Sequence, residues 1–191
     1  PSAVTIASKD EAYALHLAKS IATDNFRTYL STDMVGVEVG GGTKNVLAIG
    51  AGISDGLGFG ANSRALLITR GLIEMTRLGV SLGAQKDTFM GLSGAGDLVL
   101  TCTDDQSRNR RFGLALARGT TVDKALRESG QVVEGYYAAK SAHLVAARQK
   151  IDIPIIEQIY RVIYDGISPE KAVTSLMRRP MAMEWPGTVR D

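Results

Sequence analysis

The spacing of apolar residues predicts a short α/β segment at the start of the chain. Residues 2–7 form an apolar run typical of a strand, and residues 8–11 (Ser-Lys-Asp-Glu) have the capping-box spacing that begins an amphipathic helix. Residues 26–30 predict a second strand, and the alternating valines of residues 34–39 predict a third. These strands are too few to form an independent α/β domain. We therefore expect residues 1–39 to be the end of a larger α/β unit.

The rest of the chain has mostly helical periodicity. Three consecutive glycines, at 40–42, interrupt the pattern, and a long helix is expected to begin at Thr43 as its N-cap. Asp97–Leu100 is the one further segment that predicts a strand. Other helices are expected near residues 62–82, 108–118, 120–130, 133–150, 154–166 and 169–178, with a short turn at 87–91 and an irregular tail from residue 179.

The helix expected over residues 62–82 has two distinct faces. Polar residues recur at helical spacing along one face, which is expected to meet solvent: Arg70, Glu74, Arg77 and Ser81. Apolar residues on the opposite face are expected to pack into a core: Ile68, Leu72, Met75 and Leu82.

Composition narrows the class of protein. The chain of 191 residues is 45% hydrophobic and 22% charged, which is typical of a soluble globular protein. A single cysteine fits the reducing cytoplasm, which is the expected location. Its net charge of +2 favours neither nucleic acid nor a membrane surface as a partner, and the apolar residues 46–61 include Asp55 and five glycines, which argues against membrane insertion. Cys102 is the only cysteine, so a thiolate metal site is excluded and a buried structural thiol is expected. No metal is expected.

Glycines at 50, 52 and 56 give one segment a superficial likeness to a dinucleotide-binding turn. The fingerprint Gly-x-Gly-x-x-Gly requires the third glycine one position earlier, between a strand and a helix. Two further glycines, at 58 and 60, would lie in the helix that should follow. Close packing of helices against glycine is therefore the better interpretation of this segment.

The stretch Gly91–Arg111 is the best candidate for an anion site. Ser107 is expected to be the N-cap of a helix whose first turn carries Arg108 and Asn109. Free N–H groups, the helix dipole and an arginine would converge there, and such an arrangement holds a phosphate well. The alternative is an ordinary basic helix start on the surface. Arg110 and its neighbour Arg111 are interpreted either as surface charges or as attraction for an anionic substrate.

Four motifs follow one another along the chain. They are Lys44-Asn-Val-Leu-Ala-Ile-Gly-Ala-Gly-Ile-Ser-Asp-Gly, Gly96-Asp-Leu-Val-Leu-Thr-Cys-Thr, Ser107-Arg-Asn-Arg-Arg-Phe-Gly and Val133-Glu-Gly. Together, in this order, they closely resemble the C-terminal part of the bacterial type of NAD(P)-dependent glycerol-3-phosphate dehydrogenase. The resemblance runs from about Pro1 to Leu176.

The resemblance implies a fold that is mainly α. Residues 1–39 would be the end of a Rossmann-type domain, and residues 40–191 an all-helical substrate domain. The implied cofactor is NAD or NADP, bound mainly by a domain outside this chain, and a chain that starts at Pro1 is expected to be the inactive C-terminal part of a longer enzyme. The implied reaction is the reversible reduction of dihydroxyacetone phosphate to sn-glycerol 3-phosphate, a small phosphorylated substrate that feeds phospholipid synthesis.

The resemblance also assigns roles residue by residue. Lys44 matches the proton acceptor, and Asp97 matches a second residue at the reacting carbon. The substrate contacts fall on Lys44, Asp97, Ser107, Arg108 and Asn109, and the cofactor contacts fall on Arg108, Val132 and Glu134.

The chemistry of dehydrogenation requires a base within hydrogen-bond reach of the substrate hydroxyl. Lys44, expected in the first turn of its helix, would take that proton, and Asp97 would orient the lysine or the hydroxyl. Two other functions stay open: a related dehydrogenase of another hydroxy acid, and a non-catalytic helical module that binds an anion or a partner protein. The long apolar helices would serve as core or as a homodimer surface, and periodicity leaves both open.

Overall fold

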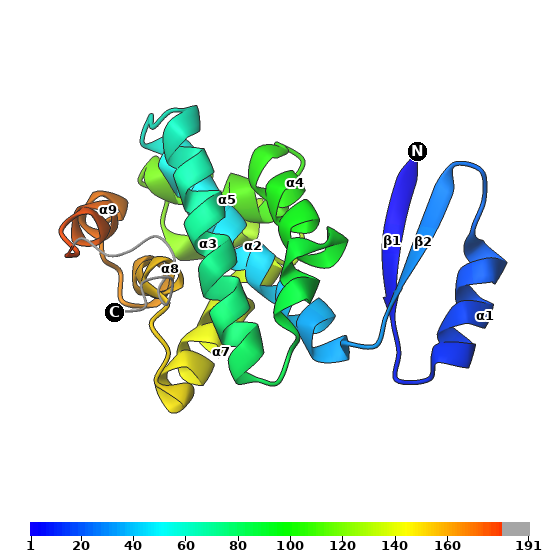
Figure 1. Cartoon of the computed structure of the whole chain (residues 1–191). Helices are drawn as coiled ribbons and strands as arrows, with labels where there is room; N and C mark the ends of the chain where they lie inside the picture. The colour runs from blue at the N-terminus through cyan, green and yellow to red at the C-terminus, as the bar shows by residue number, and fades with distance from the viewer. Residues whose placement is uncertain (181–191) are drawn as a thin grey trace.

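The computed structural model describes residues 1–180 (Figure 1). In chain order its elements are β1 (Ser2–Ala7), α1 (Glu11–Ile21), β2 (Phe26–Ser31), α2 (Met34–Gly56), α3 (Ala61–Ser81), the 3-10 turn η1 (Lys86–Met90), the π-helical turn η2 (Leu92–Gly96), α4 (Asp97–Thr103), α5 (Arg108–Ala117), α6 (Val122–Glu128), α7 (Glu134–Gln149), α8 (Pro154–Tyr164) and α9 (Pro169–Met177). The predicted class, mainly α with a short α/β segment first, is confirmed. No helix within residues 1–180 is both long and apolar enough to span a bilayer.

The first two strands and the helix between them form a β-α-β unit. β1 and β2 pair in parallel, from Ser2 beside Phe26 to Ala7 beside Ser31, as the crossover through α1 allows. The unit lies at one side of the helical bundle, and the chain passes from β2 directly into α2 (Figure 1). The N-cap of α1 is Asp10, whose carboxylate accepts the Tyr13 N–H, rather than the first residue of the predicted capping box.

The third predicted strand, residues 34–39, is wrong, because these residues form the first turns of α2. Asp33 is the N-cap, and its carboxylate accepts hydrogen bonds from Gly36 N, Gln85 N and the Thr88 hydroxyl. These hydrogen bonds hold the pKa of Asp33 below its usual value although burial opposes them. Helix α2 runs without interruption through Gly40–Gly42, so the boundary predicted between residues 39 and 40 lies inside it.

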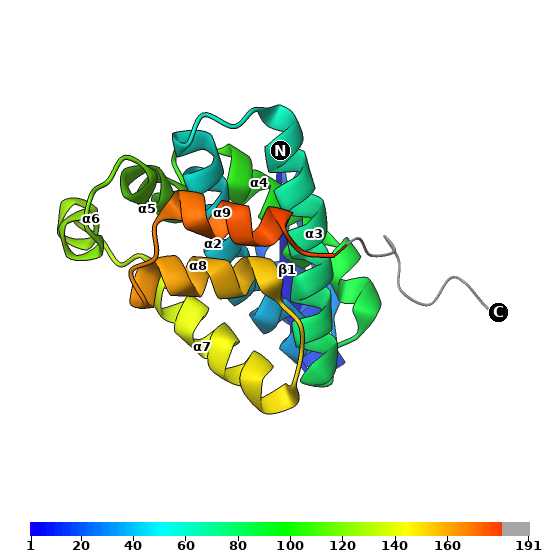
Figure 2. The same cartoon turned by 90° about the vertical axis from the view of Figure 1, so that its left-hand side faces the viewer.

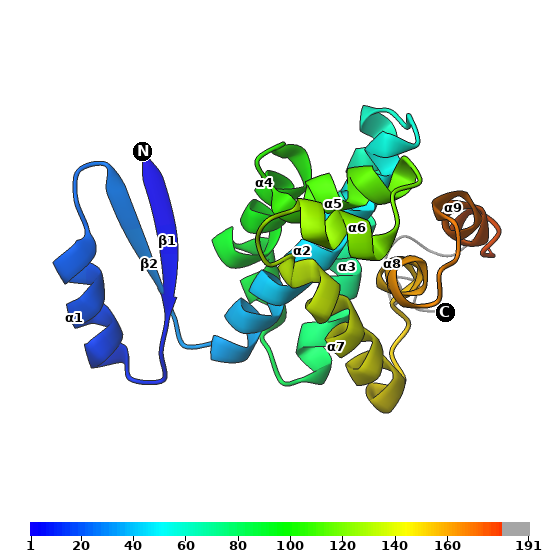
Figure 3. The ribbon, with the colours of Figure 1, turned by 180° about the vertical axis from the view of Figure 1, so that it is seen from behind.

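Helix α2 is the central element of the molecule. Its residues 46–49 are completely buried, which explains why they have no amphipathic pattern. Helices α3, α4, α5, α7 and α8 pack around it (Figure 1), and a view from behind shows α5, α6 and α7 covering the opposite side (Figure 3).

Glycines let α5 approach α2 closely, as the glycine interpretation predicted. A Cβ on Gly52 would overlap the carbonyl oxygen of Arg110, and a Cβ on Gly113 would overlap the carbonyl oxygen of Ile49. Both contacts are made by backbone atoms, which cannot move aside as a flexible side chain can.

The strand predicted at Asp97–Leu100 is also wrong, because these residues begin helix α4. Leu98 and Cys102, four residues apart, are completely buried, whereas Val99 and Leu100 are exposed. The apolar residues of this run therefore lie on more than one face of the helix. Only the buried pair, Leu98 and Cys102, has the four-residue spacing of a helix face. Cys102 is the buried thiol that was expected, and burial raises its pKa to about 12.

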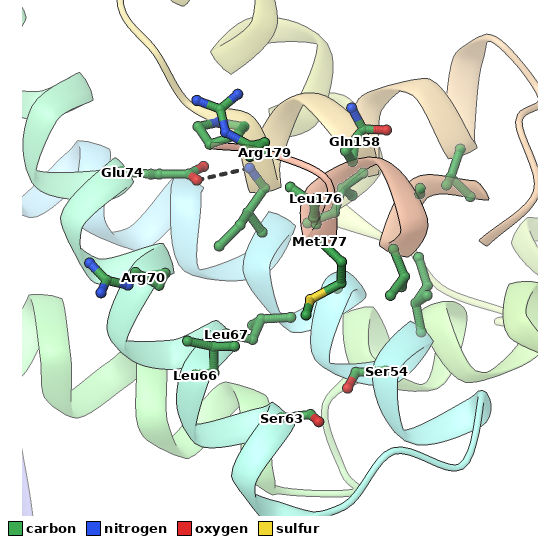
Figure 4. A pocket seen from close by; sticks show the side chains of 18 of the residues that line it. Ser54, Ser63, Leu66, Leu67, Arg70, Glu74, Gln158, Leu176, Met177 and Arg179 are labelled. Atoms are coloured by element: carbon green, nitrogen blue, oxygen red, sulfur yellow. Dashed lines mark hydrogen bonds between the residues drawn. The ribbon is translucent and has the colours of Figure 1, made fainter. Parts of the chain in front are cut away.

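The polar face predicted for α3 does not meet solvent as expected. Glu74 is buried, and its carboxylate accepts the N–H groups of Ile155 and Ile156 at the start of α8. Burial raises the pKa of Glu74 to about 7. Figure 4 shows this contact, and Figure 2 shows α8 and α9 lying across that side of the bundle. The remaining polar positions are half-buried: Arg70, Arg77 and Ser81.

The apolar face predicted for α3 is largely confirmed. Met75 is completely buried, and Ile68 and Leu72 pack against the core. Leu82 is exposed and follows the last residue of the helix.

Candidate active site

A direct ion pair joins the lysine and the acid that were singled out in the sequence. Lys44 Nζ lies 2.6 Å from Asp97 Oδ2, and the two side chains are 23% and 36% exposed. Asp97 is in the first turn of α4, directly after the η2 turn, and Gly94 in that turn packs against the backbone of Phe89. The turn thus brings the Asp97 carboxylate to Lys44 on α2. The two side chains contact each other and are also partly accessible to solvent.

The expected position of Lys44 at a helix N-terminus is not observed. Helix α2 begins ten residues earlier, at Met34, and Thr43 is a buried residue within it rather than its N-cap. The α2 dipole therefore acts little on Lys44, because its effect is confined to the first and last turns. The Asp97 carboxylate is the charged group that contacts this lysine.

Asn45, the residue after Lys44, connects three helices. Its amide nitrogen donates to Glu134 Oε2 at 3.0 Å and to Gly41 O at 3.1 Å, and its amide oxygen accepts the Asn109 side-chain N–H at 3.0 Å. Asn109 in turn accepts the backbone N–H of Gly135 at 2.9 Å. The buried polar groups are thus satisfied, and α2, α5 and α7 are fixed to one another at this point.

Sequence reasoning missed Asn45 as a functional position. A signal was present, because Asn45 is a polar residue directly before the apolar run 46–49, and a buried amide there requires hydrogen-bond partners. The identity of those partners could not be read from the sequence, since they lie 64 and 89 residues away.

The first turn of α5 has the predicted cap. Ser107 Oγ accepts the backbone N–H of Arg110 at 3.3 Å. Arg108 Nη1 donates to Gln131 Oε1 at 3.0 Å, and its Nη2 lies 3.8 Å from Glu134 Oε1. Val132 is exposed beside them in sequence, before α7. Asn109, Arg108 and Glu134 are therefore in one cluster with Asn45, whereas no hydrogen bond or ion pair among the described residues joins the Ser107 or Val132 side chain to it.

The two following arginines differ from each other. Arg110 is buried and pairs with Asp55 Oδ2 at 2.6 Å and with Asp105, so it is not a surface charge. Arg111 is exposed and donates from Nη1 to the carbonyl oxygens of Asp105 and Gln106, both at 2.9 Å. Both guanidinium groups hold the loop before α5.

A hollow of about 610 Å³ lies elsewhere, between α3, α8 and α9. Its walls are mostly apolar, with Leu66, Leu67, Leu176 and Met177 pointing into it (Figure 4). None of the predicted site residues lines it. The candidate site is therefore defined by its polar contacts rather than by this cavity.

The part of the chain that contains the candidate site is similar to a known protein family. The family described as NAD-dependent glycerol-3-phosphate dehydrogenase C-terminus matches residues 33–174, which include every residue of the candidate site. The chain belongs to this family. The matched region begins at the N-cap of α2, Asp33.

Named members of the family are similar over nearly the whole chain. A glycerol-3-phosphate dehydrogenase [NAD(P)+] of Haemophilus ducreyi is 56% identical over 185 residues, covering 96% of this chain and 55% of that protein. Its Bartonella henselae counterpart is 51% identical over 191 residues, covering 100% of this chain and 56% of that protein. The chain thus spans about half the length of the curated relatives it matches.

A solved family member has the same fold. The crystal structure of glycerol-3-phosphate dehydrogenase from Coxiella burnetii superimposes with a TM-score of 0.90 at 46% identity, covering 94% of this chain and 55% of that one. These matches favour neither of the two alternative functions, the dehydrogenase of another hydroxy acid and the non-catalytic helical module.

Proposed function

We propose that this chain forms the substrate-binding half of an NAD(P)-dependent glycerol-3-phosphate dehydrogenase. The enzyme would interconvert dihydroxyacetone phosphate and sn-glycerol 3-phosphate. The single observation that carries the proposal is the Lys44–Asp97 pair, built on the same stretch of α2 as Asn45 and its contacts to Asn109 and Glu134. The names of the relatives that match this chain support the same activity.

Lys44 is the proposed proton-transfer group. In the reductive direction its ammonium donates a proton to the carbonyl oxygen of the substrate, and in the oxidative direction its neutral amine accepts the hydroxyl proton. Asp97 accepts a hydrogen bond from Lys44 Nζ at 2.6 Å, so we assign it the role of orienting the lysine. The partial exposure of both side chains leaves room for a substrate oxygen beside them.

The phosphate end of the substrate is assigned to Ser107, Arg108 and Asn109. Backbone N–H groups at the start of α5 and the Arg108 guanidinium are donors suited to a phosphate. Asn109 is held by two hydrogen bonds, to Asn45 and Gly135, which would keep this end at a fixed position relative to Lys44. Substrate orientation of this kind accounts for much of the rate enhancement in enzymes.

The residues present fit a nicotinamide dinucleotide at one edge of this site. Arg108 and Glu134 are about two-fifths and three-fifths exposed, so the Arg108 guanidinium could contact a phosphate and the Glu134 carboxylate a ribose hydroxyl. When bound, the cofactor supplies or accepts the hydride. We assign Arg108, Val132 and Glu134 to cofactor contact, and the main cofactor site to the part of the enzyme that precedes α2.

The test compares phosphorylated and unphosphorylated substrates with the full-length enzyme. Turnover of dihydroxyacetone phosphate with NADH or NADPH is expected, with much weaker turnover of dihydroxyacetone. Arg108→Ala removes a charge-assisted hydrogen bond to phosphate, so the KM for dihydroxyacetone phosphate should rise roughly 10–100-fold. Arg118→Ala, an exposed arginine at the end of the same helix, is the control and should behave as wild type.

Two results would contradict this proposal. One is equal turnover of the two substrates by the wild-type enzyme, which would remove the phosphate from recognition. The other is an unchanged KM in Arg108→Ala, which would remove this arginine from the phosphate site.

A further inference from the structure

Helices α2 and α5 meet through a smooth interface. Gly52 and Gly56 of α2 face Arg110, Leu114 and Ala117, and Gly113 of α5 faces the backbone of Ile49. Helix pairs usually fix their relative position by fitting side-chain ridges into grooves. At these points the two helices meet through glycine and backbone atoms rather than through interlocking side chains.

Two polar contacts also tie α5 to α2 beside these glycines. At one end the Asn109 side chain donates to Asn45 Oδ1 at 3.0 Å. At the other, Arg110 Nη2 lies 2.6 Å from Asp55 Oδ2, and Asp55 also accepts from Arg64 Nη1 at 3.0 Å. The Arg110 and Asp55 side chains are only 8% and 14% exposed, so solvent screens this pair little.

Arg110 also reaches out of the interface to the loop between α4 and α5. Its Nη1 contacts the carboxylate of Asp105, which is 85% exposed on the loop. One planar guanidinium therefore joins the end of α2 to the segment that leads into Ser107, and its geometry allows two carboxylates to be held at once. Because both partners of Arg110 are carboxylates of the protein, its charge is already satisfied without a phosphate.

We propose that Arg110, together with Asp55, is a positioning residue for the substrate phosphate site. It sets the register of α5 on α2 and holds the loop at residues 104–107, so that Ser107, Arg108 and Asn109 stay opposite Lys44. This inference rests on the proposed function and adds to it. Arg110 acts through its neighbours and does not itself contact the substrate.

The test measures stability and kinetics of the full-length enzyme on the same variants. Arg110→Met leaves Asp55 with only the less buried Arg64 as its partner, and we expect a lower melting temperature and a KM for dihydroxyacetone phosphate raised roughly 10-fold, with kcat changed much less. The double variant Arg110→Met/Asp55→Asn removes both charges, so its melting temperature should recover most of the loss. Its KM should stay raised, because the side-chain link from α2 to the loop is then lost and only the Asn45–Asn109 and Arg111 contacts remain.

Two further variants separate the loop contact from the interface contact. Asp105→Ala removes only an exposed side chain and should fold normally, with a smaller rise in KM than Arg110→Met. Arg110→Lys can pair with Asp55 but cannot span both carboxylates, so it should restore the melting temperature more fully than the KM. Arg118→Met, on the same helix but exposed, is the matched control and should change neither quantity.

The outcomes are distinguishable from a failure of the proposed function. Absence of dihydroxyacetone phosphate turnover by the wild-type enzyme would overturn the proposed function and this inference with it. A second set of results would overturn this inference alone. In it the wild-type enzyme turns over normally, the KM of the double variant recovers together with its melting temperature, and the KM of Asp105→Ala is unchanged. Arg110 would then have a structural role only. If Arg110→Met does not fold, Asp105→Ala and Arg110→Lys still decide the question.

Discussion

Two ion pairs on α2 have the same length and different surroundings. Lys44–Asp97 and Arg110–Asp55 both join the helix to a later element at 2.6 Å. The first has side chains 23% and 36% exposed, and the second 8% and 14%. Distance alone therefore does not reveal the role of a pair. The half-buried Lys44–Asp97 pair can exchange its partner for a substrate atom, whereas the Arg110–Asp55 pair is positioned to hold its helices together.

The two ion pairs are also expected to differ in how much they contribute to the free energy of unfolding. An exposed ion pair contributes about 0–1 kcal/mol to stability, because solvent screens it and ordering two side chains costs entropy. Breaking a buried pair by removing one partner costs about 3–5 kcal/mol, because a charge is left without compensation. The central helix thus carries the proposed site and a structural contact, and we expect the proposed site to contribute less to stability than the buried pair.

The largest effect on stability is expected at the buried pair. Arg110→Met should lower the free energy of unfolding by about 3–5 kcal/mol, toward the lower end of that range because Asp55 keeps its contact with Arg64. Chemical denaturation of this chain, followed by circular dichroism, measures it. A loss below 1 kcal/mol would show that the Arg110–Asp55 pair behaves as a surface pair, and the distinction between the two would disappear.

A somewhat smaller effect is expected at a third buried charge, Glu74. Burial raises its pKa from the usual 4.5 to about 7. Between these values the folded state keeps a proton that the unfolded state has lost, so stability falls as pH rises. At about 1.4 kcal/mol per pH unit the total is about 3 kcal/mol, present below pH 4.5 and lost above pH 7.

The measurement compares the free energy of unfolding at pH 5 and pH 8 in wild type and Glu74→Gln. The variant does not titrate at this position, so its stability should fall less over that interval than the wild type's. Parallel pH profiles for the two proteins would mean that Glu74 is ionised throughout, with the N–H groups of Ile155 and Ile156 outweighing its burial.

The smallest effect on stability is expected at the exposed pair. Lys44→Met should change the free energy of unfolding by less than about 1 kcal/mol, since both side chains of the pair reach solvent. The same denaturation experiment applies, with Arg110→Met measured beside it. A loss comparable to that of Arg110→Met would place Lys44 among the structural residues.

Much of the helical architecture could be predicted from the sequence, and the reasons differ from element to element. Local signals sufficed where a cap or a proline marks the start, as at Ser107 for α5 and Ser168 for α9. They failed at residues 34–39, because the N-cap of α2 takes its other partners from Gln85 and Thr88. Tertiary contacts there override the strand preference of alternating valines.

The candidate site shows the same limit. The motif that includes Lys44 and Asn45 indicated the stretch of α2 where the polar contacts lie, but the contacts of Asn45 depend on partners in α5 and α7. Glu74 is predicted on the solvent face from its place in the polar stripe, and Arg110 either as a surface charge or as attraction for an anionic substrate, yet both are buried. Ion pairs and hydrogen bonds to residues far away in the sequence decide which charged side chains are buried. The periodicity of apolar residues does not reveal those partners.

The central claim is that Lys44 transfers the substrate proton. Its most direct test is the kcat/KM of the full-length Lys44→Met enzyme for reduction of dihydroxyacetone phosphate, measured across pH. The account predicts a loss of about 10²–10⁴-fold in a protein whose stability is close to that of the wild type. A kcat/KM and a pH–rate profile equal to those of the wild type would contradict it and leave the Lys44–Asp97 pair without a catalytic role.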